Sequence, residues 1–133
     1  MKKILLTLAA FGALTFTAAA QNDAKKAAQE NMTPEQRADK ETKHATEKLG
    51  LSTDQAAKFK VYSLERARSN KALREQAKNT PKEERPKLKE QRKANNDKFF
   101  ANVNSILNAE QQTKWAEHKK KMQEKQAKNE AHD

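Results

Sequence analysis

The sequence has 133 residues and a formal net charge of +10, with 28 Lys and Arg residues against 18 Asp and Glu residues. It contains no Cys, so disulfide bonds cannot stabilise it. Large apolar residues are also scarce. This scarcity is typical of largely unfolded proteins, or of helical proteins that complete a core by pairing with another chain. Composition alone does not choose between the two.

Residues 1–20 have the layout of a cleavable secretory signal peptide. Lys2 and Lys3 precede an apolar run, and three Ala residues at 18–20 supply a small-residue cleavage site. The apolar run is short for a membrane span, and polar residues follow it at once. We therefore expect export to a bacterial periplasm, with no stable insertion in the membrane.

The rest of the chain favours an all-α fold. Gly50 is the one glycine after the predicted signal peptide, and Ala, Lys, Glu, Gln and Arg, which are good helix formers, dominate. We expect a flexible basic leader at 21–31, a helical domain at 32–125 and a disordered tail at 126–133. Pro86 leaves open whether the third helix begins there, after a bent turn at 80–85. The predicted helices are 34–49, 53–78, 82–106 and 109–128.

Apolar residues in three of these helices recur every three or four positions, which indicates one buried seam on each helix. The seams are narrow and interrupted by polar residues, so we expect long antiparallel helical hairpins that form an elongated homodimer. The predicted seams are Phe59, Tyr62, Arg66, Ser69, Leu73 and Ala77, widened by Val61 and Leu64; Leu88, Arg92, Asn95, Phe99, Val103 and Ile106; and Trp115, His118 and Met122.

One short pattern occurs twice in full, as LSTDQAAKFK at 51–60 and LNAEQQTKWA at 107–116, and once in shorter form, as MTPEQRADK at 32–40. Each copy places an N-cap residue three positions before a Gln, which is typical of a helix start. The Thr33 and Ser52 copies fit the full reciprocal capping box, whereas the Asn108 copy keeps only its N-cap half. Thr80 and Glu83 have the same spacing. The pattern offers no nucleophile, acid–base pair or phosphate cradle, so we expect neither an enzyme nor a cofactor. The motif residues are Leu51, Ser52, Gln55, Leu107, Asn108, Gln111, Met32, Thr33 and Gln36.

The two fuller copies, with Leu51, Ser52 and Gln55 in one, resemble the paired LTxxQ motifs of the Spy/CpxP family of periplasmic proteins, over about residues 30–125. Asn108 stands where that family has Thr, and the many Lys and Gln residues make the chain look like a lysine-rich, divergent member. The resemblance implies a thin, cradle-shaped α-helical dimer. It also implies an ATP-independent chaperone, a repressor of envelope-stress signalling or a metal-responsive sensor. For the motif residues it implies a structural role only.

A chaperone that holds unfolded client proteins suits the basic composition. A positive surface attracts unfolding chains over a distance, and Lys and Arg stems can cover apolar segments while their charges stay in water. The client-binding candidates are Arg66, Arg68, Lys71, Arg74, Lys78, Lys87, Lys89, Arg92, Lys93 and Lys98.

Two alternatives have weaker support. His44, His118 and His132 are the only His residues and none has a metal-ligand spacing from another, so we expect no metal site; His118 and Met122, one turn apart, are weak candidates. The sequence pI of about 9.8 would suit nucleic-acid binding. The export signal, the interspersed acidic residues and the few aromatic residues oppose it, so we expect no nucleic-acid partner.

Overall fold

The computed structural model describes residue 28 and residues 31–130, and it divides the chain into two units, Met1–Asn31 and Met32–Asp133. The predicted signal peptide at 1–20 lies outside the described residues, as does almost all of the predicted leader. Within the described part of the second unit the regular structure is entirely helical, which confirms the all-α prediction. Its elements are α2 (Pro34–Leu49), α3 (Thr53–Lys78), the 3₁₀ helix η1 (Lys82–Glu84), α4 (Arg85–Ile106) and α5 (Ala109–Glu130).

The connection between α2 and α3 follows the predicted signals. Thr33 and Gln36 form a capping box at the start of α2, with Pro34 in the first turn. Gly50 ends α2 with φ 66°, and its N–H donates to the Thr46 carbonyl at 2.9 Å. This left-handed conformation strains any residue with a Cβ, which explains the glycine.

For the connection between α3 and α4 we considered a helix start capped by Thr80 and a bent turn at 80–85, and the structure has the second. The Thr80 hydroxyl does not cap the start of a helix; it donates back to the Gln76 carbonyl in the last turn of α3 at 2.7 Å. The predicted capping box at Thr80 is therefore wrong. Instead η1 follows, and α4 begins at Arg85 with Pro86 in its first turn. A proline in the first turn removes an N–H that would have no helical partner, so the bent-turn alternative at 80–85 is the one that holds.

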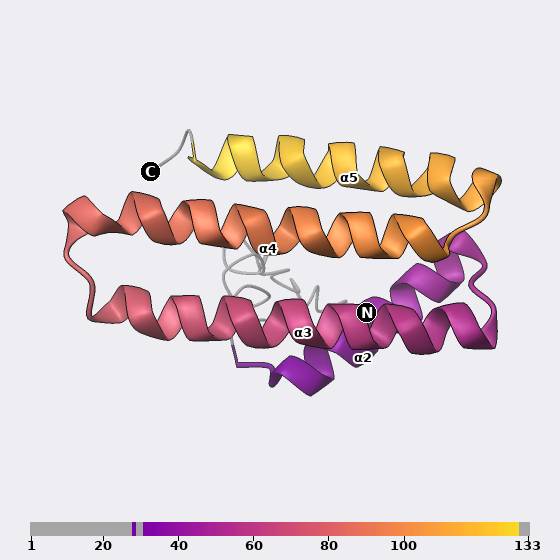
Figure 1. Cartoon of the computed structure of the whole chain (residues 1–133), viewed down its shortest axis with the longest axis horizontal. Helices are drawn as coiled ribbons and strands as arrows, with labels where there is room; N and C mark the ends of the chain where they lie inside the picture. Colours follow the sequence, from indigo (N-terminus) through magenta and orange to yellow (C-terminus); the bar gives the residue numbers. More distant parts are fainter. Residues whose placement is uncertain (1–27, 29–30, 131–133) are drawn as a thin grey trace, which may run out of the picture. The chain divides into compact units, whose positions relative to one another are not determined.

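Figure 1 shows α3 and α4 running side by side in opposite directions, with α5 returning beside α4. Contacts that join α3 to α4 include Asn70 with Asn96 at 3.4 Å, Lys98 with Glu65 at 2.6 Å, and the Arg66 guanidinium 3.8 Å from the centre of the Phe99 ring. α2 packs against α3, and the beginning of α5 packs against α2 and α4.

The hydrophobic core lies where α2 and α4 end and where α3 and α5 begin. Phe59, Phe99 and Trp115 meet there edge to face, with ring centres 5.6 to 5.9 Å apart. The Trp115 indole N–H donates to the Phe100 carbonyl at 3.3 Å, so its polar atom is satisfied. The buried members of this core are Ala45, Leu49, Leu51, Phe59, Phe99, Phe100, Val103, Leu107 and Trp115.

Two predicted seam residues lie outside the buried seams. Val61 is 62% exposed, because it is two positions from Phe59 and so lies on nearly the opposite side of α3. Arg92 is exposed on α4, toward the η1 turn and away from the aromatic core. Conversely, Ser63, Ala67 and Phe100 are buried although we did not place them in a seam.

The C-terminal helix is longer than predicted. α5 extends to Glu130, into the segment at 126–133 that we expected to be disordered. That segment has no Gly or Pro, and its Ala, Lys, Gln and Glu residues favour helix, so nothing local ends the helix at residue 125. No helix in the described part of the chain is both long enough and apolar enough to cross a membrane.

Candidate functional site

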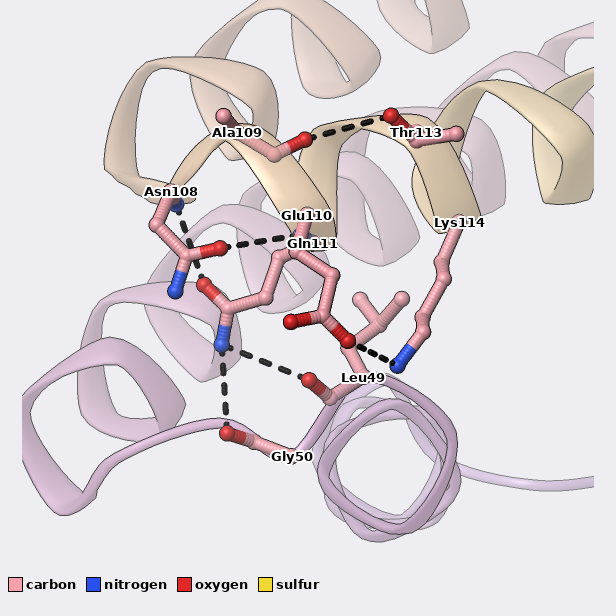
Figure 2. Close-up of polar contacts among 8 residues, drawn as sticks. All are labelled: Leu49, Gly50, Asn108, Ala109, Glu110, Gln111, Thr113 and Lys114. Atoms are coloured by element: carbon pink, nitrogen blue, oxygen red, sulfur yellow. Dashed lines mark hydrogen bonds and ion pairs between the residues drawn. The ribbon is translucent and has the colours of Figure 1, made fainter.

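The two fuller copies of the repeated pattern begin α3 and α5 with the same set of hydrogen bonds. At the start of α3 the Gln55 N–H donates to Ser52 Oγ at 3.2 Å, and the Ser52 N–H donates to Gln55 Oε1 at 3.0 Å. At the start of α5 the Gln111 N–H donates to Asn108 Oδ1 at 2.9 Å, and the Asn108 N–H donates to Gln111 Oε1 at 3.1 Å (Figure 2). Asn108 therefore completes a full reciprocal capping box, where we had predicted only its N-cap half.

The two capping boxes also bond to each other. Gln55 Nε2 donates to Gln111 Oε1 at 2.8 Å, and Gln111 Nε2 donates to Gln55 Oε1 at 3.1 Å. We call this reciprocal pair, Gln55 with Gln111, the glutamine clasp. Each side chain thus caps its own helix and holds the start of the other one.

Each glutamine of the clasp also reaches the chain just before the other copy. Gln55 Nε2 donates to the Ile106 carbonyl at 2.8 Å. Gln111 Nε2 donates to the carbonyls of Leu49 and Gly50 at 3.3 and 3.1 Å (Figure 2). The clasp therefore satisfies carbonyl groups at the ends of α4 and α2, which helices leave without partners.

Burial agrees with a structural role for these residues. Leu51 is 8% exposed, Leu107 is 7% exposed and Gln111 is 6% exposed. No buried side-chain nitrogen or oxygen of the described residues is without a hydrogen-bond partner. Four connected helix ends and a fully bonded polar pair next to the aromatic core fix the helices relative to one another.

The third copy stands apart from the clasp. Met32 is half-buried, and Thr33 and Gln36 form their capping box at 3.0 and 3.2 Å. Among the residues that the structure describes, Gln36 bonds to neither Gln55 nor Gln111. The sequence repeat predicted three helix starts correctly but gave no sign of which copies pair.

The ten cationic candidates for client binding do not form one surface. Arg66 is a core residue: its side chain is 10% exposed, it pairs with Glu41 at 2.6 Å, and its guanidinium stacks on the Phe99 ring. Ser63 Oγ donates to the same Glu41 carboxylate. Arg66 therefore joins α2, α3 and α4 and is not available to a client.

Three further candidates lie on the surface in ion pairs. Arg68 pairs with Glu35 at 2.9 Å, and the other two pairs are Lys78 with Glu75 at 2.8 Å and Lys98 with Glu65 at 2.6 Å. The remaining six candidates are exposed and form no ion pair within the described part of the chain. They are Lys71, Arg74, Lys87, Lys89, Arg92 and Lys93.

These six residues, which we call the basic tip, flank η1 on α3 and α4, away from the aromatic core. Charges of the basic tip act on the half-buried Arg37. Burial lowers the pKa of the Arg37 guanidinium, and the positive charges of Arg74, Arg66 and Arg92 lower it further, while Glu41 opposes them. Of these charges, those of Arg74 and Arg92 belong to the basic tip.

The model of a protein family, described as a domain of unknown function (DUF4890), matches residues 20–115. The chain belongs to the DUF4890 family. No curated protein and no solved structure matches the chain. The matched range spans both halves of the glutamine clasp and ends at Trp115, so the family pattern covers the aromatic core and the basic tip of this DUF4890 chain.

The weak metal candidates of this DUF4890 chain both lie on α5. His118 and Met122 are half-buried, and Met122 packs against the aromatic core. No group of three or more His, Cys, Asp or Glu residues that could hold a metal ion occurs in the described ranges. The structure does place His118 beside His44, a neighbour that sequence spacing did not reveal, because the two residues belong to α5 and α2.

Proposed function

We propose that this protein is an exported, ATP-independent chaperone-like protein that binds unfolded or aggregating proteins of the bacterial envelope on the basic tip of α3 and α4. The observation that carries the proposal is the accumulation of six exposed cationic residues, without ion pairs in the described chain, at the end of these helices that lies away from the core. The resemblance to the Spy/CpxP family supports the same function.

Physical chemistry explains how such a surface would hold a client. Positive charge attracts an unfolded acidic chain before contact, and this attraction weakens when salt is added. Leu73 and Ala77 are half-buried between the cationic residues of α3 and offer shallow apolar contacts. Flexible Lys and Arg stems add apolar contact without burying a charge. Weak, adaptable binding of this kind needs no nucleotide.

A homodimer is part of the proposal. The aromatic core occupies only one end of α3 and α4, and Tyr62, Leu64 and Leu73 remain half-buried along α3. A second copy packed on these residues would bury apolar surface that a small single chain leaves exposed. Sedimentation equilibrium at several concentrations tests this: twice the chain mass supports the dimer, and a single-chain mass at every concentration contradicts it.

Export is also part of the proposal, and the sequence of residues 1–20 supports it. The mass of the protein recovered from the envelope fraction of expressing bacteria tests it directly. Loss of about the first 20 residues is expected from the signal layout. An intact N-terminus, or recovery only from the cytoplasm, would contradict export.

The functional test is light scattering by an aggregating client protein at low and high salt. We expect the protein to suppress aggregation at low salt and to suppress it less at high salt, because screening weakens the attraction. Absence of suppression at low salt, while circular dichroism shows a helical protein, would contradict the proposal.

Matched charge variants distinguish the effect of the basic tip on aggregation from the effect of the protein's net charge. The test variant carries Lys71→Gln, Arg74→Gln and Lys89→Gln, all at exposed positions of the tip. The control carries Lys40→Gln, Lys43→Gln and Lys58→Gln, which are exposed positions of α2 and the start of α3. Both lose three positive charges. We expect the test variant alone to lose most of its suppression, whereas equal losses would assign the effect to overall charge.

A further inference from the structure

His44 of α2 and His118 of α5 lie close together in the folded chain. Their ring centres are 6.5 Å apart and the ring planes are inclined by 54°. His44 is exposed and His118 is half-buried. α2 and α5 are far apart in the sequence, so only the fold brings these imidazoles together.

The surroundings of His118 hold its ring in place and lower its pKa. The ring stacks on the Trp115 indole, with centres 5.2 Å apart and planes inclined by 15°. Burial lowers the pKa of His118, and the charges of His44, Arg66 and Lys121 lower it further, while Glu41 opposes them. The stacking holds the His118 ring in place beside His44.

The separation of the rings fits a shared ion after a small movement. A metal ion about 2.0 to 2.1 Å from an imidazole nitrogen lies roughly 3 Å from the ring centre. Two imidazoles on one ion then have centres about 5 to 6 Å apart. The observed 6.5 Å is slightly longer. Because His44 is exposed, its side chain can turn toward His118 without disturbing the core.

We propose that His44 and His118 form a two-histidine site for a borderline transition-metal ion, with water as the remaining ligands. Imidazole suits copper, nickel and zinc, and Cu²⁺ binds nitrogen ligands most tightly among the divalent ions of the first transition row. The ion would link α2 to α5 and so hold α5 against the rest of the helices. This site is independent of client binding by the basic tip.

The single tryptophan makes the site measurable. Trp115 stacks on His118, so Cu²⁺ bound at His118 should quench its fluorescence. The full-length protein is titrated with Cu²⁺ alone at pH 7.5, and a chelator then reverses the binding. Ion binding to the folded state should also raise the unfolding temperature, in proportion to the logarithm of the Cu²⁺ concentration.

The deciding variant is His44→Ala, because His44 is exposed and does not contact Trp115. We expect it to weaken Cu²⁺ binding by about tenfold or more, since losing even an outer partner of a metal ligand costs 10- to 100-fold. His132→Ala, in the segment outside the described residues, is the control and should bind as the wild type does. Unchanged quenching in His44→Ala, or loss of binding in His132→Ala, would overturn the proposed site.

Discussion

Gln55 and Gln111 each serve two helices. Each amide oxygen accepts from the N-cap residue of its own helix and from the opposite glutamine, and each amide nitrogen donates across to the other copy and to a preceding helix end. The sequence repeat predicted that both residues begin helices. It could not predict their pairing, because a capping box is a local structure and the clasp depends on how α2 to α5 pack.

A double-mutant cycle at the clasp tests its contribution to stability. Gln55→Ala and Gln111→Ala should each lower the free energy of unfolding by about 1–3 kcal/mol, since each leaves buried polar groups unpaired. The double variant should lose less than the sum of the two, by about 1–2 kcal/mol. Urea unfolding followed by circular dichroism measures all three. Gln36→Ala is the matched control: it removes one capping box but no clasp, and should cost clearly less.

Arg66 and Arg68 provide a second comparison between single residues. Arg66→Met keeps an apolar stem but leaves the half-buried Glu41 without its cation and removes the stacking on Phe99. We expect it to lower the free energy of unfolding by about 2–3 kcal/mol, somewhat below the usual cost of breaking a fully buried pair. Arg68→Met removes only an exposed ion pair with Glu35 and should change stability little. Similar losses in both variants would contradict the assignment of Arg66 to the core.

Helix boundaries were the part of the fold that local sequence predicted best. Thr33, Ser52 and Asn108 begin helices as expected, and Gly50 ends one. The features that we predicted wrongly depend on packing between helices, or on two local sequence signals that favour different helix starts. Thr80 has a capping-box spacing, but Pro86 directs the helix to start later. Phe100 follows a predicted seam residue and is buried because Trp115 of α5 packs against it, with ring centres 5.2 Å apart.

Ser52 and Thr80 both have the spacing of a capping box, but only Ser52 caps the start of a helix, so their substitutions should differ in cost. Ser52→Ala should lower the free energy of unfolding by about 1 kcal/mol, because it removes the acceptor for the Gln55 N–H. Thr80→Ala should change it by less than about 0.5 kcal/mol, because Thr80 caps no helix start and its hydroxyl bonds only to an exposed carbonyl at the end of α3. The urea midpoints at constant slope give both values. A larger loss in Thr80→Ala than in Ser52→Ala would contradict the description of the two turns.

At the scale of the whole molecule, the aromatic core and the unpaired cationic candidates lie at opposite ends of α3 and α4. The clasp and the aromatic core occupy one end, and the basic tip occupies the other. The ten cationic candidates could be listed from sequence, but their division into core, ion-paired and unpaired residues required the fold. That division narrows the proposed client surface to Lys71, Arg74, Lys87, Lys89, Arg92 and Lys93.

The most direct test of this proposed surface is a binding titration without aggregation. A fluorescently labelled acidic polypeptide, kept unfolded by reduction and carboxymethylation, is titrated with the protein at low and high salt, and its anisotropy is recorded. The account predicts binding of the unfolded polypeptide that weakens with salt and is lost in the basic-tip variant, with no binding of the same polypeptide in its native state. Failure of the folded protein to bind the unfolded polypeptide at low salt would contradict it.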